Sequence, residues 1–182
     1  MQKLKLKDRS GFTIIEIMIV LAIAGLIMLI VFLAVPALQR SARNTSRKND
    51  VGNISTAIAN YISNNNGTPP GMESGAFNQT TCNNDIYDST GPSGIVTTIK
   101  LGYYTDAQVY CAQPGSAITN CSSVGTSSCT ASSTEVTTEN VIYIPGDTCS
   151  GNSPTSGAGR GFALVYEVES GSSSAQEQCL AG

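Results

Sequence analysis

Hydrophobic positions form one continuous run near the start of the chain. Residues 17–35 carry no charge, and Gly25 is the only break in these nineteen positions. At a rise of about 1.5 Å per residue, a helix of this length spans roughly 28 Å, close to the hydrocarbon thickness of a bilayer. A cleaved secretory signal has a shorter apolar core of about 7–15 residues and then a small-residue cleavage site, which residues 36–39 do not supply. The pattern therefore predicts one membrane-spanning helix.

Beyond this run the helical pattern continues, but only one face of the helix stays apolar. This stripe, typical of a helix that packs against a sheet, recurs every three to four residues at Val51, Ile54, Ile58 and then Tyr61 or Ile62. Residues 64–70 then bring three asparagines, a glycine and two prolines, which favour a left-handed turn and stop a helix. We expect a single helix over about residues 12–65, with an amphipathic half at residues 37–66.

The second part of the chain has the alternating pattern of β-strands. Alternation is clearest at residues 161–169, and weaker strand patterns cover residues 102–111 and 140–145. Residues 95–99 predict a short additional strand. We therefore expect an α+β fold in which the long helix packs against three or four antiparallel strands.

Three segments between these elements read as loops. Residues 68–94 follow the helix, residues 115–138 are more than half serine and threonine, and residues 150–161 are rich in glycine, serine and proline. None of the three has the apolar content to bury much surface. Residues 67–182 are therefore expected to form a head with long loops and a small core, which disulfides would stabilise.

The cysteines indicate the compartment of this head. All six follow the apolar run, and an even number in a small Gly/Ser/Thr-rich region favours disulfides formed in an oxidising compartment. Zinc binding is disfavoured because the chain has no histidine and no Cys-x-x-Cys pair. Basic residues flank the apolar run on both sides and do not set its orientation, so the cysteines place the C-terminal part outside the cell. They are Cys82, Cys111, Cys121, Cys129, Cys149 and Cys179.

Sequence alone leaves the pairing of these cysteines open. Cys149 with Cys179 is our prediction, because this bond would tie the C-terminal tail beside the last predicted strand. Cys121 and Cys129 are candidates to close the hydroxyl-rich loop that contains both of them.

One acid, Glu16, lies at the start of the apolar run. An acid in a membrane helix is costly and usually has a partner or a function, although one near the membrane surface is tolerated when it reaches the headgroups. Before it comes a short basic leader, and the junction is SGFTIIE at residues 10–16. This arrangement resembles the class III signal of type IV prepilins and their relatives.

The resemblance implies a processing site and a role for the acid. In that family a prepilin peptidase cuts after the glycine, here between Gly11 and Phe12, and Phe12 becomes an N-methylated terminus. Glu16 would then be the fifth residue of the mature chain. The resemblance implies that it meets the terminal amine of a neighbouring subunit as helices stack into a filament, since a buried charge is acceptable beside an opposite one.

The resemblance also divides the chain. Residues 1–11 would be a cleaved cytoplasmic leader, residues 12–36 the membrane and filament-core helix, and residues 37–66 and 67–182 the amphipathic helix and the head. Gly25 lies where many members have a helix-weakening glycine, whereas Pro36 lies later than the usual proline. Our hypothesis is that helicity is lost between these two residues when subunits pack.

The charged residues outside the predicted membrane helix indicate which partners the protein could bind. Arg40, Arg43 and Arg47 recur at helical spacing, and this basic face would meet either lipid headgroups or acidic side chains of adjacent subunits. The chain after Gly11 has six basic and twelve acidic residues, so its net charge is −6. A nucleic-acid partner is therefore only weakly supported.

The sequence gives catalysis little support. It has no histidine, phosphate-binding loop, metal-ligand cluster or nucleophile elbow, so we expect no enzyme and no cofactor. Asp85, Asp88 and Asp147 are candidate calcium ligands, but their spacing matches no calcium loop, and we expect no metal.

Three functions remain. The first is the major pilin of a type IV pilus, a homopolymer used for adhesion, twitching motility or DNA uptake. It would pass from the inner membrane to the cell surface with the help of prepilin peptidase, a membrane assembly platform, and assembly and retraction ATPases. The second is a pseudopilin of a type II secretion system. The third, a single-pass membrane protein with an extracellular binding domain, would need neither the Gly11–Phe12 junction nor Glu16.

Overall fold

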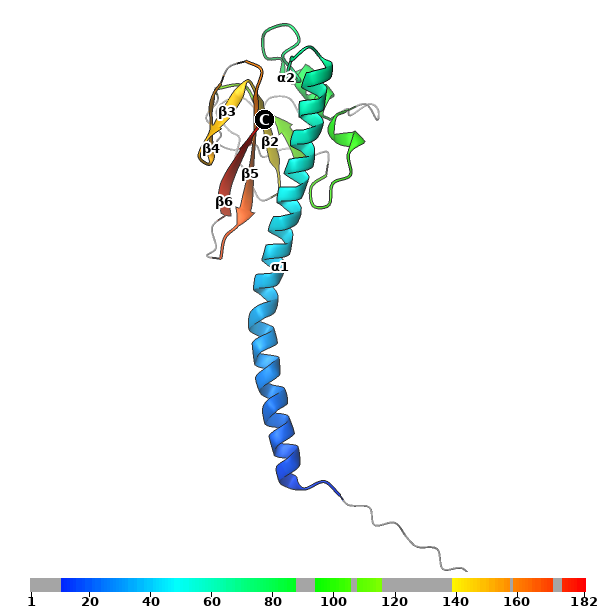
Figure 1. Ribbon diagram of the computed structural model, residues 1–182, viewed down its shortest axis with the longest axis vertical. Helices are drawn as coiled ribbons and strands as arrows, with labels where there is room; N and C mark the ends of the chain where they lie inside the picture. The colour runs from blue at the N-terminus through cyan, green and yellow to red at the C-terminus, as the bar shows by residue number, and fades with distance from the viewer. Residues whose placement is uncertain (1–10, 88–93, 106–107, 116–138, 158, 172–174) are drawn as a thin grey trace, which may run out of the picture. The chain divides into compact units, whose positions relative to one another are not determined.

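The computed structural model (Figure 1) describes residues 11–87, 94–105, 108–115, 139–157, 159–171 and 175–182. The chain divides into two compact units, Met1–Arg40 and Ser41–Gly182. Helix α1 (Ile14–Asn64) begins in the first unit and ends in the second. The helix that we expected over residues 12–65 is thus confirmed to within two residues at each end.

In the first unit, α1 is apolar on all sides. It contains an 18-residue window with a mean hydropathy of 3.2, so this helix is long and apolar enough to cross a membrane. Gly25 and Pro36 both lie inside α1, and neither ends it. The missing N–H of Pro36 removes one helical hydrogen bond, but α1 continues for another seven turns beyond it, at about 3.6 residues per turn.

The end of α1 follows the turn chemistry expected from its asparagines and glycine. Asn66 and Gly67 adopt left-handed conformations, with φ of 57° and 81°. The Gly67 N–H donates to the carbonyl of Ile62 at 2.8 Å, which is the long bond of a Schellman turn. This turn satisfies a carbonyl that the end of the helix would otherwise leave free and directs the chain back toward the sheet.

The second unit contains a mixed four-stranded sheet in the order β1-β2-β5-β6. Its strands are β1 (Val109–Cys111), β2 (Val141–Pro145), β5 (Phe162–Glu169) and β6 (Ala175–Ala181). The pairs β2–β5 and β5–β6 are antiparallel, with Tyr143 opposite Leu164 and Val165 opposite Cys179. A separate antiparallel hairpin is formed by β3 (Asp147–Ser150) and β4 (Ser153–Ser156). The α+β class is confirmed.

Pairing of β1 differs from our expectation of an antiparallel sheet, because β1 runs parallel to β2. The connection between them, residues 112–140, is long enough for the crossover that a parallel pair requires. The strand predicted over residues 102–111 is therefore wrong for residues 102–105 and 108, and among its described residues only the last three pair. The strand predicted at residues 95–99 is also wrong. That segment contains the 3₁₀ helix η1 (Val96–Thr98), in which two threonine hydroxyls bond to nearby carbonyls.

Four elements, namely α2 and the strands β3, β4 and β6, were missed in segments that the sequence predicted as loops or left unassigned. Helix α2 (Gln79–Ile86) interrupts the predicted loop of residues 68–94, and Asn78 caps it by accepting the Thr81 N–H at 3.1 Å. The hairpin strand β4 occupies part of the predicted loop of residues 150–161, and β6 follows the last predicted strand. These elements are rich in polar residues, so their hydrophobic pattern is weak. They owe their stability to the neighbours that they contact.

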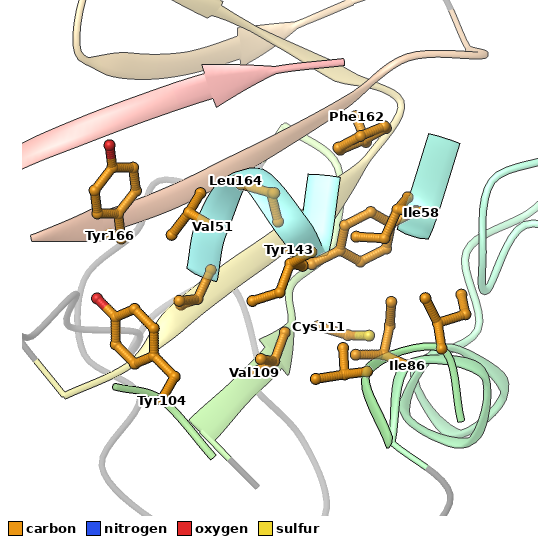
Figure 2. Packing of buried hydrophobic residues seen from close by; sticks show 14 of the residues in the cluster. Val51, Ile58, Ile86, Tyr104, Val109, Cys111, Tyr143, Phe162, Leu164 and Tyr166 are labelled. Atoms are coloured by element: carbon orange, nitrogen blue, oxygen red, sulfur yellow. The ribbon is translucent and has the colours of Figure 1, made fainter. Parts of the chain in front are cut away.

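The apolar stripe of α1 packs on the sheet as expected (Figure 2). Val51, Ile54 and Ile58 are completely buried in a cluster with core residues of β2 and β5, among them Tyr143 and Leu164. Burying a branched aliphatic side chain contributes about 1.5–3 kcal/mol, so these contacts are a main source of the stability of the head. The opposite face of the sheet buries a second cluster, which the cysteines of β3 and β6 partly cover.

On the N-terminal side of this stripe, polar contacts hold α1 against the end of β5. Arg43 binds both carboxylate oxygens of Glu169, at 2.8 and 2.6 Å, and the buried Arg47 binds the same carboxylate at 2.8 Å. Hydrogen bonding from Arg43, together with Arg47, lowers the pKa of Glu169 to about 2. Two arginines of the predicted basic face are therefore engaged by an acid of their own chain.

Two disulfides cross-link the described part of the head. Cys82–Cys111 joins α2 to β1, and Cys149–Cys179 joins β3 to β6. The second is the pair that we predicted, and it is confirmed. No cysteine in the described residues has a free thiol. Cys121 and Cys129, which we considered as a loop-closing pair, lie outside the described residues.

The two bonds should differ in their reactivity. Cys82 and Cys111 are 0% and 1% exposed, whereas Cys149 and Cys179 are partly exposed, and exchange requires access of the attacking thiolate. We expect alkylation without reductant to label none of the four, and limiting reductant to open Cys149–Cys179 first. Peptide mapping by mass spectrometry measures both. Equal rates of reduction, or labelling before reduction, would contradict this assignment.

Candidate processing and assembly site

The predicted cleavage point lies before the first turn of α1. Residues 11–13 have no regular secondary structure and are exposed, and Phe12 is 86% exposed. A Cβ atom added to Gly11 would meet nothing within 4 Å, and its φ is not in the left-handed region. The fold therefore places no demand for glycine at this position. A requirement for Gly11 would have to come from another protein, as cleavage by a peptidase would impose.

Glu16 has a partner within its own chain. Its Oε2 atom accepts the backbone N–H of Thr13 at 2.8 Å and the Thr13 hydroxyl at 2.7 Å. The Glu16 N–H in turn faces the Thr13 hydroxyl oxygen at 3.4 Å. Thr13 immediately precedes α1, so the two residues form a capping box, which satisfies N–H groups that the start of a helix leaves free.

This cap gives Glu16 a structural role that our sequence interpretation missed. The signal was present as Thr-x-x-Glu directly before an apolar run, which is the sequence pattern of a capping box. A carboxylate at this position also faces the positive end of the helix dipole. Both bonds from Thr13 end on Oε2, so the cap leaves the other carboxylate oxygen for a second donor. The contact with a neighbouring subunit's amine stays a prediction.

Apolar side chains surround the helix that follows. Every large apolar residue of α1 from Ile14 to Leu38 is exposed, and a Cβ at Gly25 would again meet nothing within 4 Å. A helix that is hydrophobic all round needs an apolar environment, which either lipid or the helices of other subunits can supply. The predicted loss of helicity between Gly25 and Pro36 concerns a packed filament and stays a prediction.

Two of the acids considered as calcium ligands accept hydrogen bonds from backbone N–H groups. Asp85 accepts the N–H of Gly71 at 3.0 Å, and the buried Asp147 accepts the N–H of Gly115 with both oxygens at 3.2 Å. Asp88 lies outside the described residues. Within the described part, no group of three or more histidine, cysteine or acidic side chains is arranged to hold a metal ion.

Comparison with known proteins identifies the N-terminal motif. Residues 6–32 match the family model of the prokaryotic N-terminal methylation motif, a stretch that includes Gly11, Phe12, Glu16 and Gly25. No curated protein and no solved structure matches the chain. The sequence of the junction, the exposed peptide before α1 and the apolar helix that follows agree with this match. The chain carries the prokaryotic N-terminal methylation motif, the class III signal of type IV pilins and pseudopilins.

Proposed function

We propose that this protein is the structural subunit, the major pilin, of a type IV pilus. After cleavage between Gly11 and Phe12, the apolar half of α1 would anchor the subunit in the inner membrane. An assembly platform and its ATPases would then move it into a filament on the cell surface. The observation that carries the proposal is the methylation motif at residues 6–32, because it marks a chain for processing and polymerisation.

The properties of α1 support polymerisation. Its exposed apolar side chains need lipid before assembly and could be covered by the same segments of neighbouring subunits afterwards. The second half of α1 belongs to a separate compact unit with its own core and disulfides. A subunit built in this way could leave the membrane with its head already folded.

A pseudopilin of a type II secretion system is the second candidate, because the methylation motif is shared by both classes. The long hydroxyl-rich segment and the six cysteines favour the pilus. Genes for a retraction ATPase beside this one would support the pilus, and genes for a secretion system with its secretin would support the pseudopilin.

Purified surface fibres provide the test of the proposed function. We expect fibres whose main subunit is this chain, starting at Phe12 with an N-methyl group, because the motif directs both cleavage and methylation. Electron microscopy and mass spectrometry of the same material would establish both points. Fibres lacking this chain, or containing it with an intact Met1, would contradict the proposal.

A variant at the junction tests processing separately. Gly11→Ile should leave a longer, membrane-bound precursor with a folded head, since nothing in the fold requires glycine at this position. Gly52→Ala is a suitable control because a Cβ there also meets nothing within 4 Å. Normal processing of the Gly11 variant would show that the cut lies elsewhere.

A further inference from the structure

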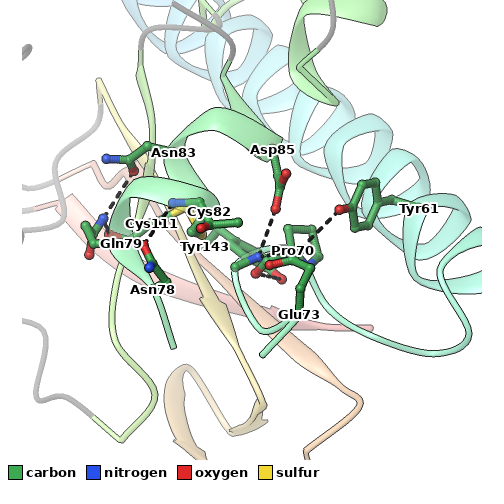
Figure 3. The surroundings of a disulfide bond; sticks show 12 residues. Tyr61, Pro70, Glu73, Asn78, Gln79, Cys82, Asn83, Asp85, Cys111 and Tyr143 are labelled. Atoms are coloured by element: carbon green, nitrogen blue, oxygen red, sulfur yellow. Dashed lines mark hydrogen bonds between the residues drawn. A yellow bond between two sulfur atoms is a disulfide. The ribbon is translucent and has the colours of Figure 1, made fainter. Parts of the chain in front are cut away.

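Two acids and a phenol meet where the chain leaves α1 and passes α2 (Figure 3). The Gly71 N–H points at Oε1 of Glu73 at 3.2 Å and at Oδ2 of Asp85 at 3.0 Å. The Tyr61 hydroxyl donates to the same Glu73 oxygen at 3.2 Å. The two carboxyl groups therefore lie close together, because both accept the same backbone N–H.

The backbone around this pair is fixed at both ends of a short loop, residues 72–77. A Cβ at Gly71 would lie 2.4 Å from the Cβ of Cys82, whose disulfide ties α2 to β1. The Gly71 carbonyl accepts the Asn78 N–H at 2.9 Å, and Asn78 caps α2. Between these fixed ends the loop carries Glu73, and residues 73–76 are exposed. A change in the carboxyl pair would therefore move this loop rather than α2.

The surroundings favour the protonated form of Asp85 more than water does. Burial and the hydrogen bond with Glu73 raise the pKa of Asp85 to about 6, although the Gly71 N–H opposes this. For Glu73, burial acts to raise the pKa, but its own backbone N–H and the bond with Asp85 outweigh burial and lower it. Among the residues that the structure describes, the other titratable groups that face the pair are Tyr61 of α1 and Tyr143 of β2, and burial raises the pKa of both phenols further above neutrality.

We propose that Glu73 and Asp85 share one proton and form a pH-sensitive latch, which holds the 72–77 loop closed on Tyr61 while the proton is bound. Protonated Asp85 donates to the Glu73 carboxylate, and Glu73 in turn accepts the Tyr61 hydroxyl. When the proton leaves, two adjacent carboxylates repel each other. Glu73 then turns into solvent with its exposed loop, and Tyr61 loses its hydrogen bond to Glu73.

The direction of the pH dependence follows from the raised pKa. A carboxyl group with a higher pKa in the closed state than in the open state binds its proton more tightly when closed. The contribution of the Asp85 proton to the stability of the closed loop is therefore complete below the ordinary aspartate pKa of 3.8 and is lost as the pH rises through about 6. The lowered pKa of Glu73 has the opposite effect, so the contribution of Glu73 is present above its ordinary pKa of 4.5 and is lost at lower pH. Polymerisation plays no part in this step, so failure of the latch would leave the proposed pilus function untouched, and the reverse also holds.

Hydrogen exchange of the full chain in detergent micelles tests the latch. Asp85→Asn is the matched variant, because its neutral amide can donate to Glu73 at every pH. Dividing the wild-type exchange rate of residues 72–77 by that of the variant removes the intrinsic effect of pH on exchange. We expect this ratio to rise about tenfold between about pH 5 and about pH 7.5, given the two pKa values. A constant ratio would overturn the proposal.

A second measurement covers the case in which Asp85→Asn does not fold. Carboxyl-carbon NMR of the wild-type chain should show Asp85 titrating near pH 6. In Glu73→Gln this midpoint should fall and opening of the loop should depend less on pH, because burial of Asp85 remains but the effect of Glu73 is lost, while Asp147→Asn should change neither. An unshifted Asp85 midpoint in wild type would refute the shared proton.

Discussion

Replacing Glu16 by glutamine is expected to leave the protein inserted, processed and folded, yet nearly abolish its fibres. The expectation rests on the proposed pilus function and on the predicted pairing of Glu16 with the terminal amine of the next subunit. Glutamine can replace glutamate in a capping box, so the start of α1 should be retained. Only the negative charge that would attract an incoming amine is lost. Glu16→Ala removes both cap and charge and should fail in the same direction.

Thr13→Ala separates the two roles of this carboxylate. It deletes the hydroxyl that lies 2.7 Å from Glu16 but keeps the charge and the backbone N–H that lies 2.8 Å away. If charge pairing controls assembly, this variant should form more fibres than Glu16→Gln. If capping controls assembly, Thr13→Ala should be the more severe of the two.

Fibre number and length, counted by electron microscopy, measure these outcomes. Non-reducing gels and the mass of the mature chain are the controls for folding and processing. Normal fibres from both Glu16 variants would refute the pairing. Glu16 would then be a helix-capping residue that the membrane surface tolerates.

Features of the fold could be predicted from the sequence where they depend on contacts between residues that are close together in the chain. The bounds of α1, the turn at its end and its buried stripe follow from neighbours within a few residues. The processing motif is likewise continuous in sequence. By contrast, β1 pairs with a strand some thirty residues away and runs parallel to it, which no local pattern specifies.

Among the polar contacts, too, the local ones could be predicted from the sequence and the long-range ones could not. The Thr13–Glu16 cap is local and could have been predicted from its spacing. The Glu73–Asp85 pair could not, because it depends on a helix, α2, whose sequence QTTCNNDI lacks an apolar stripe. The ion pairs of Glu169 could not be predicted either, since its two arginine partners lie more than a hundred residues earlier.

Asp50 is the strongest example of a long-range determinant, and its removal should have the largest effect on the stability of the head. This buried acid of α1 accepts three consecutive backbone N–H groups, those of residues 102–104. The bonds are 2.6–3.0 Å long. They explain why residues 102–104 form no strand, because their donors are turned toward the helix and not toward β2.

Asp50→Ala would leave these donors without a partner beside the apolar cluster. Each unsatisfied buried group costs about 1–3 kcal/mol, so we expect the free energy of unfolding to fall by about 3–5 kcal/mol. For a head of this size the melting temperature should fall by about 10–20 °C. Asp50→Asn keeps an acceptor oxygen and should lose less.

Asp147→Ala is the matched control for this prediction. Asp147 is as buried as Asp50, at 2% against 3% exposure, but accepts only the Gly115 N–H among the described residues, at 3.2 Å. Its removal should therefore cost about a third as much, since one donor is lost instead of three. Thermal unfolding of the full chain, followed by circular dichroism with both disulfides intact, compares the two. Equal losses would mean that burial of the acid, and not the number of N–H groups it satisfies, determines its contribution to stability.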